Sequence, residues 1–90
     1  MQLFSTERKL RNCVVKLEAK QTELAIAQEQ LAALKDELDD ARIRALVSET
    51  PSAEMLWQEH AKHLVAYERD EKAIKEQIIE LQARKRKLES

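Results

Sequence analysis

Leucine recurs every seven residues through the first half of the chain, at Leu3, Leu10, Leu17, Leu24, Leu31 and Leu38. The residues three positions after each of these leucines are Thr6, Cys13, Lys20, Ala27, Leu34 and Ala41. A seven-residue repeat keeps one edge of a slightly underwound helix facing a partner. The pattern therefore predicts a long helix over about residues 3–47, with a seam that is weakest at Lys20, where the side chain must snorkel toward water.

The second half carries a stripe with alternating steps of three and four residues: Trp57, His60, Leu64, Tyr67, Glu71, Ile74, Ile78, Leu81, Lys85 and Leu88. This is also a heptad pattern, and it predicts a second helix over about residues 51–89. Glu71 and Lys85 are its charged members. Charges on such a stripe mark a frayed seam or fix the register at some cost in stability.

Between the two patterns lies the only proline of a chain that has no glycine. The hydroxyl of Thr50 can cap a new helix, and Pro51 suits its first position because proline has no amide hydrogen to leave unpaired. Proline also disfavours helical geometry in the residue before it. We therefore expect a turn at about residues 48–50. Two helices of similar length joined by a short link predict an antiparallel hairpin, and the alternative is one continuous rod kinked at Pro51.

The fold class predicted is all-α, an antiparallel two-helix coiled-coil hairpin forming a single domain over residues 1–90. The composition agrees, since 43% of residues are hydrophobic, 37% are charged and 3% are aromatic, as in long helices and coiled coils. A two-helix seam leaves other apolar side chains exposed, and dimerisation into a four-helix bundle would cover some of them. The residues expected to be exposed are Val14, Val15, Ile26, Ile43, Leu46, Val65 and Ile79.

Charge is unevenly distributed, although the net charge is only −1. Residues 1–20 hold five bases and two acids, residues 71–90 hold six bases and four acids, and residues 21–70 hold five bases and eleven acids. A hairpin would be basic at its termini and acidic toward its turn. This polarity fits either solubility and charge pairing along the helices or oriented docking on a surface of opposite sign.

The residues that could carry chemistry favour structural roles. His60 and His63 are three apart on a helix, but a metal site needs more ligands, and His60 belongs to the apolar stripe. Cys13 is the single cysteine, so an internal disulfide is impossible, and on a seam a thiol acts as a small hydrophobe. No phosphate-binding glycine loop, paired-cysteine motif or nucleophile elbow occurs. We expect no enzyme activity, catalytic residue, metal or cofactor.

The cellular location and the class of partner are predicted from features that the sequence lacks. No apolar run reaches the ~18 residues of a membrane span, and the N-terminus has no signal-peptide core, so a cytoplasmic location is expected. Nucleic acid is an unfavourable partner because the total charge is near neutral. The basic run Arg84, Lys85, Arg86 and Lys87 is spread around a helix without interleaved aromatic residues.

The remaining candidates are residues that would bind protein. Trp57 and Tyr67 are expected mainly to pack in the seam, and a tryptophan just after a turn can also anchor an interface. Charged docking would use an acidic group near the turn and a basic group near the terminus. These groups are Asp36, Asp39 and Asp40, and Arg84, Lys85, Arg86 and Lys87.

The segment "SAEMLWQEHAKHLVAYERDEKAIKEQIIELQARKRKLE" resembles the second helix of the stalk proteins of type III secretion and flagellar export systems. The resemblance covers mainly residues 52–89, and family members are usually longer. It implies a helical hairpin that inserts into a hexameric export ATPase and contacts the export gate or escorts chaperones. The matching positions are Trp57, Tyr67, Glu71, Lys72, Ile74, Gln77, Ile78 and Leu81.

The function expected is protein–protein interaction or assembly, with the export stalk as its specific form. An export ATPase or gate component would be the partner, and homo-oligomerisation is expected as well. Two alternatives stay open: a small helical chaperone that shields a client protein, and a nucleic-acid-associated coiled-coil regulator.

Overall fold

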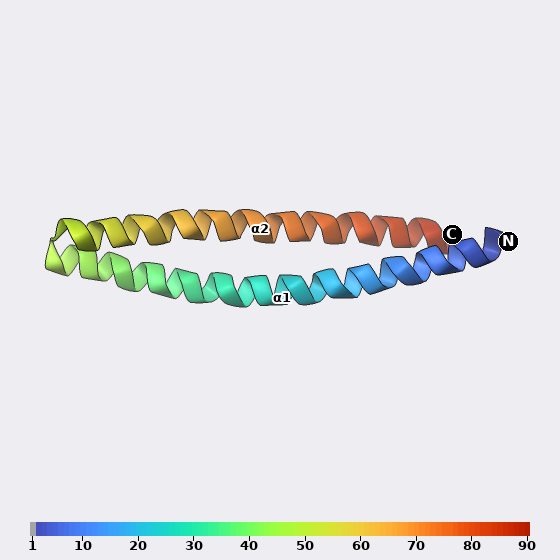
Figure 1. Ribbon diagram of the computed structural model, residues 1–90, viewed down its shortest axis with the longest axis horizontal. Coiled ribbons are helices and arrows are strands. Elements are labelled where there is room, and N and C mark those ends of the chain that lie inside the picture. The colour runs from blue at the N-terminus through green and yellow to red at the C-terminus, as the bar shows by residue number, and fades with distance from the viewer. Residues whose placement is uncertain (1) are drawn as a thin grey trace. The chain divides into compact units, whose positions relative to one another are not determined.

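A computed structural model describes residues 2–90, with side chains from Phe4 onward. The side chain of Leu3, the first leucine of the repeat, lies outside the described residues. The chain forms two helices, α1 over Gln2–Ser48 and α2 over Pro51–Glu89 (Figure 1). The predicted all-α helical hairpin is thereby confirmed, and the helices begin and end within one residue of the expected positions.

The turn between the helices has the cap that was predicted from Thr50 and Pro51. The Thr50 carbonyl accepts the first bond of α2 from the Glu54 amide at 3.1 Å, and its Oγ1 accepts a bond from the Ala53 amide at 3.3 Å. Thr50 is therefore the N-cap of α2, with Pro51 at the first helical position. Glu49 follows the last residue of α1 with a φ of 52°, a left-handed conformation that glycine usually provides at this position.

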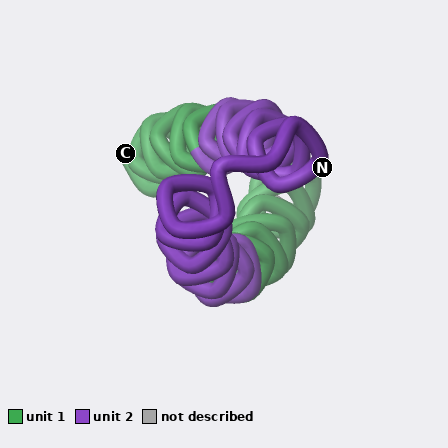
Figure 2. Tube along the Cα trace, turned by 90° about the vertical axis from the view of Figure 1, so that its left-hand side faces the viewer, with its two compact units in different colours: residues 1–25, 72–90 green, residues 26–71 purple. Residues whose placement is uncertain are grey.

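The chain divides into two compact units, and each contains part of both helices (Figure 2). Unit 1 consists of residues 1–25 and 72–90, and unit 2 of residues 26–71. Residues distant in sequence meet within each unit: in unit 1 the Cys13 thiol donates a bond to the Leu81 carbonyl at 3.3 Å. A single kinked rod could not make this contact, so the alternative of a continuous helix is wrong.

The seam of unit 1 follows the predicted heptads. Cys13 and Leu17 of α1 and Ile74 and Ile78 of α2 are buried, and the neighbouring seam positions are half-buried except Thr6, which is exposed. Half-buried members include the two charged residues of the seam, Lys20 and Lys85. Their methylene stems can cover apolar neighbours while their ammonium groups reach water.

The seam of unit 2 combines leucine and alanine residues of α1 with aromatic and aliphatic residues of α2. Leu31 and Ala41 are buried, and Trp57 and Leu64 are half-buried. Tyr67 departs from the pattern because it is 39% exposed although it stands on the stripe. Its ring is large and its hydroxyl is polar, so a seam only two helices wide leaves part of it in water.

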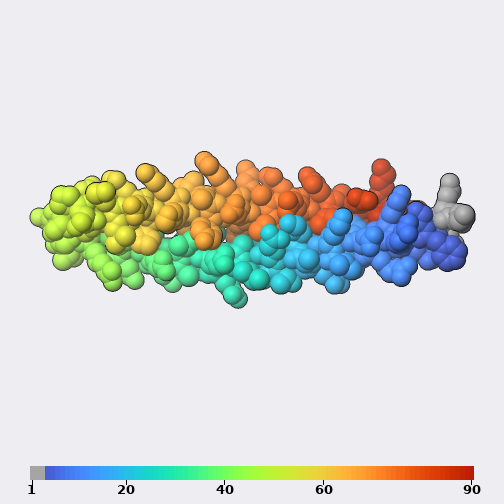
Figure 3. Space-filling model, in the orientation of Figure 1, coloured from blue at the N-terminus to red at the C-terminus, as the bar shows by residue number. Residues whose placement is uncertain are grey.

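Most apolar side chains that were expected outside the seam are indeed exposed. Val14 is half-buried, and the other six are exposed: Val15, Ile26, Ile43, Leu46, Val65 and Ile79. Long side chains also stand out from the surface along both helices (Figure 3). A core one layer thick cannot cover them.

Candidate functional site

The acidic candidates lie on the side of α1 that faces away from the seam. Asp36, Asp39 and Asp40 are all exposed in unit 2. Asp36 lies one turn before both Asp39 and Asp40, and those two consecutive residues are about 100° apart around the axis. The same face continues toward the turn with exposed Ile43 and the neighbouring pair Leu46 and Val47.

Apolar side chains gather around the turn in unit 2. Val47, for example, is 80% exposed. We call the group the turn surface, and it consists of Ile43, Leu46 and Val47 of α1 and Met55 and Leu56 of α2, all exposed. Sequence reasoning had named only Ile43 and Leu46. The overlooked signal was the adjacent pairs "LV" and "ML", because consecutive helical residues cannot both point into one seam.

The first aromatic candidate borders this region. Trp57 is half-buried in the α2 seam of unit 2 and lines a cavity of about 340 Å³ beside the turn, together with Ala45, Leu46, Glu49, Thr50 and Glu54. Trp57 therefore packs in the seam and also borders an opening that a partner could reach. Tyr67 is partly exposed in the same unit but does not line this cavity.

The basic candidates of unit 1 do not form one face. Lys85 is a half-buried seam residue whose Nζ lies 3.7 Å from Oε1 of Glu89. Arg84, Arg86 and Lys87 are exposed. Consecutive helical residues are about 100° apart around the axis, so these four side chains cannot bind one flat partner together.

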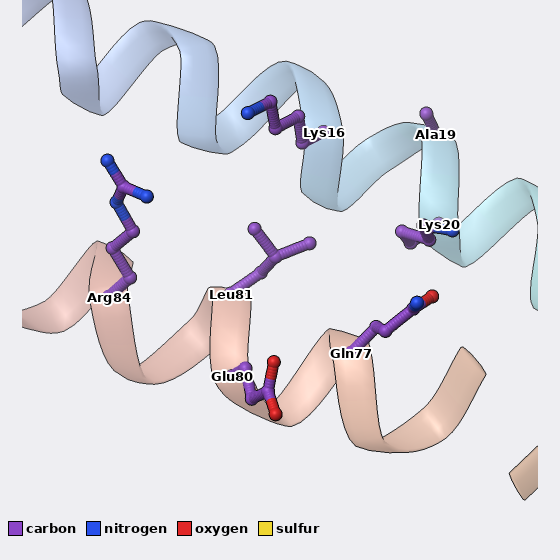
Figure 4. Close-up of a pocket in the computed structure, with 7 residues that line it drawn as sticks. All are labelled: Lys16, Ala19, Lys20, Gln77, Glu80, Leu81 and Arg84. Carbon is purple, nitrogen blue, oxygen red and sulfur yellow. The ribbon is translucent and has the colours of Figure 1, made fainter. Parts of the chain in front are cut away.

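Unit 1 also contains a groove of about 390 Å³ between its two helical segments (Figure 4). Leu81 points from α2 toward α1, whereas the Ala19 methyl group points away from α2. The other lining residues are Lys16, Lys20, Gln77, Glu80 and Arg84. The α1 residues that line the groove are alanine and lysine, without a branched apolar side chain among them. An apolar side chain with a neighbouring acid is the chemistry that it fits.

His60 is a half-buried residue of the unit 2 seam whose Nδ1 atom is buried. Its Nδ1 atom has no hydrogen-bond partner, and the nearest carboxylate oxygen recorded is Oε2 of Glu37, 4.0 Å away. His63, its expected companion, is exposed. Within residues 2–90 no group of three histidine, cysteine or acidic side chains converges as metal ligands do. The same residues contain no helix whose length and hydropathy would let it cross a bilayer.

No family model matches the chain, and neither the curated proteins nor the solved structures contain a match. The export-stalk resemblance thus depends on the sequence pattern alone. In the structure, several of its matching positions are seam residues: Ile74 and Ile78 are buried and Leu81 is half-buried. Any heptad-based helix would place apolar residues there.

Proposed function

We propose that the chain is a protein-binding helical hairpin, an assembly factor that joins another protein through the turn surface. The observation that carries this proposal is the cluster of five exposed apolar side chains, Ile43, Leu46, Val47, Met55 and Leu56. Large apolar side chains left exposed close to one turn favour interaction with another protein. The hairpin holds the cluster in place from both sides of a capped turn.

The turn surface has a composition suited to binding. Methionine and branched aliphatic side chains adapt to a partner and release apolar area from water, at roughly 25 cal/mol per Å² buried. Trp57 lies at its edge, half-buried, where a partner that completes its burial would gain an aromatic anchor. The adjacent Asp36, Asp39 and Asp40 would select partners with basic residues beside an apolar contact.

The specific form of this function is a stalk of a type III secretion or flagellar export apparatus. The support is the resemblance of residues 52–89, including Trp57 and Tyr67, together with the hairpin fold. In this form the partner is an export ATPase or an export gate component, and the charged surfaces orient the hairpin on it. Binding would then weaken as salt is raised.

Site-specific cross-linking in the native host tests the proposal. A photoreactive phenylalanine replaces Met55 on the turn surface, and the matched control replaces Arg69, which is exposed on the same helix two heptads later. We expect a cross-link to a different protein from position 55 and none from position 69. Leu56→Asp, next to the probe on the same helix, should reduce that cross-link. Equal yields from both positions, or none from position 55, would overturn the proposal.

A further inference from the structure

A strip of apolar and basic side chains runs along α1 in unit 1, on the side away from the seam. Phe4, Arg8, Arg11 and Val15 are all exposed, with Phe4 75% exposed. Their spacings of four, three and four residues keep them on one face of the helix. We call this group the basic stretch.

Unit 2 carries a second strip on the outward side of α1. Asp36, Asp40, Ile43 and Val47 are all exposed, and their spacings are again four, three and four residues. Asp39 and Leu46 flank them on neighbouring positions, also exposed. We call these six residues the acidic stretch, and its apolar part belongs to the turn surface.

The basic stretch and the acidic stretch have the same spacing when they are aligned in opposite chain directions, as in an antiparallel helix pair. In this alignment the residue number rises along one helix as it falls along the other. The pairs are Phe4 with Val47, Arg8 with Ile43, Arg11 with Asp40, and Val15 with Asp36. Phe4 thus meets Val47 and Arg11 meets the Asp40 carboxylate, whereas the other two pairs each place a charged side chain beside an apolar one. Asp36 lies one turn from Asp40 on the same face, so Arg11 has two acids within reach.

The charge of the two units points in the same direction. Unit 1 has eleven lysine and arginine residues against six acids, a net charge of +5. Unit 2 has five lysine and arginine residues against eleven acids, a net charge of −6. Unit 1 of one molecule therefore attracts unit 2 of another, and the repulsion between units of the same sign disfavours the pairing of like units.

We propose that the occupant of the acidic stretch is a second copy of this chain, whose basic stretch packs on it antiparallel. The inference rests on the proposed function, since it names a partner for part of the turn surface. Both stretches face away from the seam, so the contact forms without opening either unit. Met55 and Leu56, on the other helix, stay available to a different protein.

Sedimentation equilibrium of the purified full chain and its variants tests the pairing. Wild type should self-associate at micromolar concentrations, and more weakly in high salt. Arg11→Asp and Asp40→Arg should each raise the dissociation constant about tenfold or more, since each replaces an attraction by a repulsion. The double variant R11D/D40R exchanges the two charges and should associate about as tightly as wild type. Arg69→Asp, a reversal on the exposed side of α2, is the matched control and should have no effect.

The rescue by the double variant is the decisive result. Self-association that is unaffected by either single reversal, or that the double variant does not restore, would overturn the pairing. So would a wild-type chain that stays monomeric. Helicity of every variant is checked by circular dichroism, and exposed charges on outward helical positions should leave it unchanged. Cross-linking from position 55 is read separately, so a failed pairing with a retained cross-link would leave the proposed function standing.

Discussion

Replacing Lys20 by leucine should stabilise the hairpin. Lys20 is a seam residue of unit 1 whose side chain is 31% exposed, and its Nζ is paired with Oε2 of Glu23 at 3.0 Å. Full burial of a leucine side chain contributes about 1.5–3 kcal/mol. About a third of the side chain would stay exposed, and the lysine stem already covers part of the seam. The lost ion pair, half exposed at Glu23, contributes only about 0.3 kcal/mol. The expected net gain is about 1 kcal/mol.

Thermal unfolding followed by circular dichroism measures this gain. For a chain of this size, about 1 kcal/mol corresponds to a rise in Tm of about 4–8 °C. Lys16→Leu is the matched control, because Lys16 lines the same groove from an exposed position and should change Tm by no more than about 1 °C. Scans at several concentrations separate folding from association. An unchanged or lower Tm for Lys20→Leu, or an equal rise for Lys16→Leu, would refute the seam assignment.

Three further substitutions test the turn and the seam by the same assay. Glu49→Gly should raise stability by about 0.5–1 kcal/mol, because the residue at φ 52° loses the steric cost of a side chain there; a loss of stability would contradict the left-handed cap. Thr50→Ala removes the bond to the Ala53 amide and should cost about 1 kcal/mol, so an unchanged Tm would argue against capping. His60→Leu removes the unpartnered Nδ1 atom and should stabilise by about 1 kcal/mol; destabilisation would show that the imidazole has a partner.

The seam could be predicted from sequence because heptad spacing translates directly into one helical edge. Leu17 and Leu31 are buried where the leucine repeat placed them, and Ile74 and Ile78 where the second stripe did. Tyr67 shows the limit of this reasoning, since its position on the stripe was recognised but its exposure was not. Exposure depends on how much a single opposing helix can cover, and residue spacing does not contain that information.

The turn and the surface were less predictable. Thr50 and Pro51 identified the break, whereas Glu49 carries no mark of its left-handed conformation. Phe4 and Val47 are among the most exposed apolar residues, yet in sequence they resemble other helix residues. Whether such side chains are covered depends on further layers of structure, and unit 2 has none around its turn. Charged residues are exposed in almost any fold, so the acidic and basic candidates stay predictions.

The central claim is that the seam residues stabilise the fold, whereas the turn surface binds a partner and adds little to folding. Val47→Lys tests it directly, because Val47 is 80% exposed and a lysine at the end of a helix suits the helix dipole. Unfolding and sedimentation equilibrium are measured on the same samples. At concentrations low enough to keep both chains monomeric, the account predicts a Tm within about 2 °C of wild type, and at higher concentrations it predicts weakened self-association. A clear fall in Tm would show that Val47 is packed within the fold, and unchanged association would show that the turn surface is not the contact.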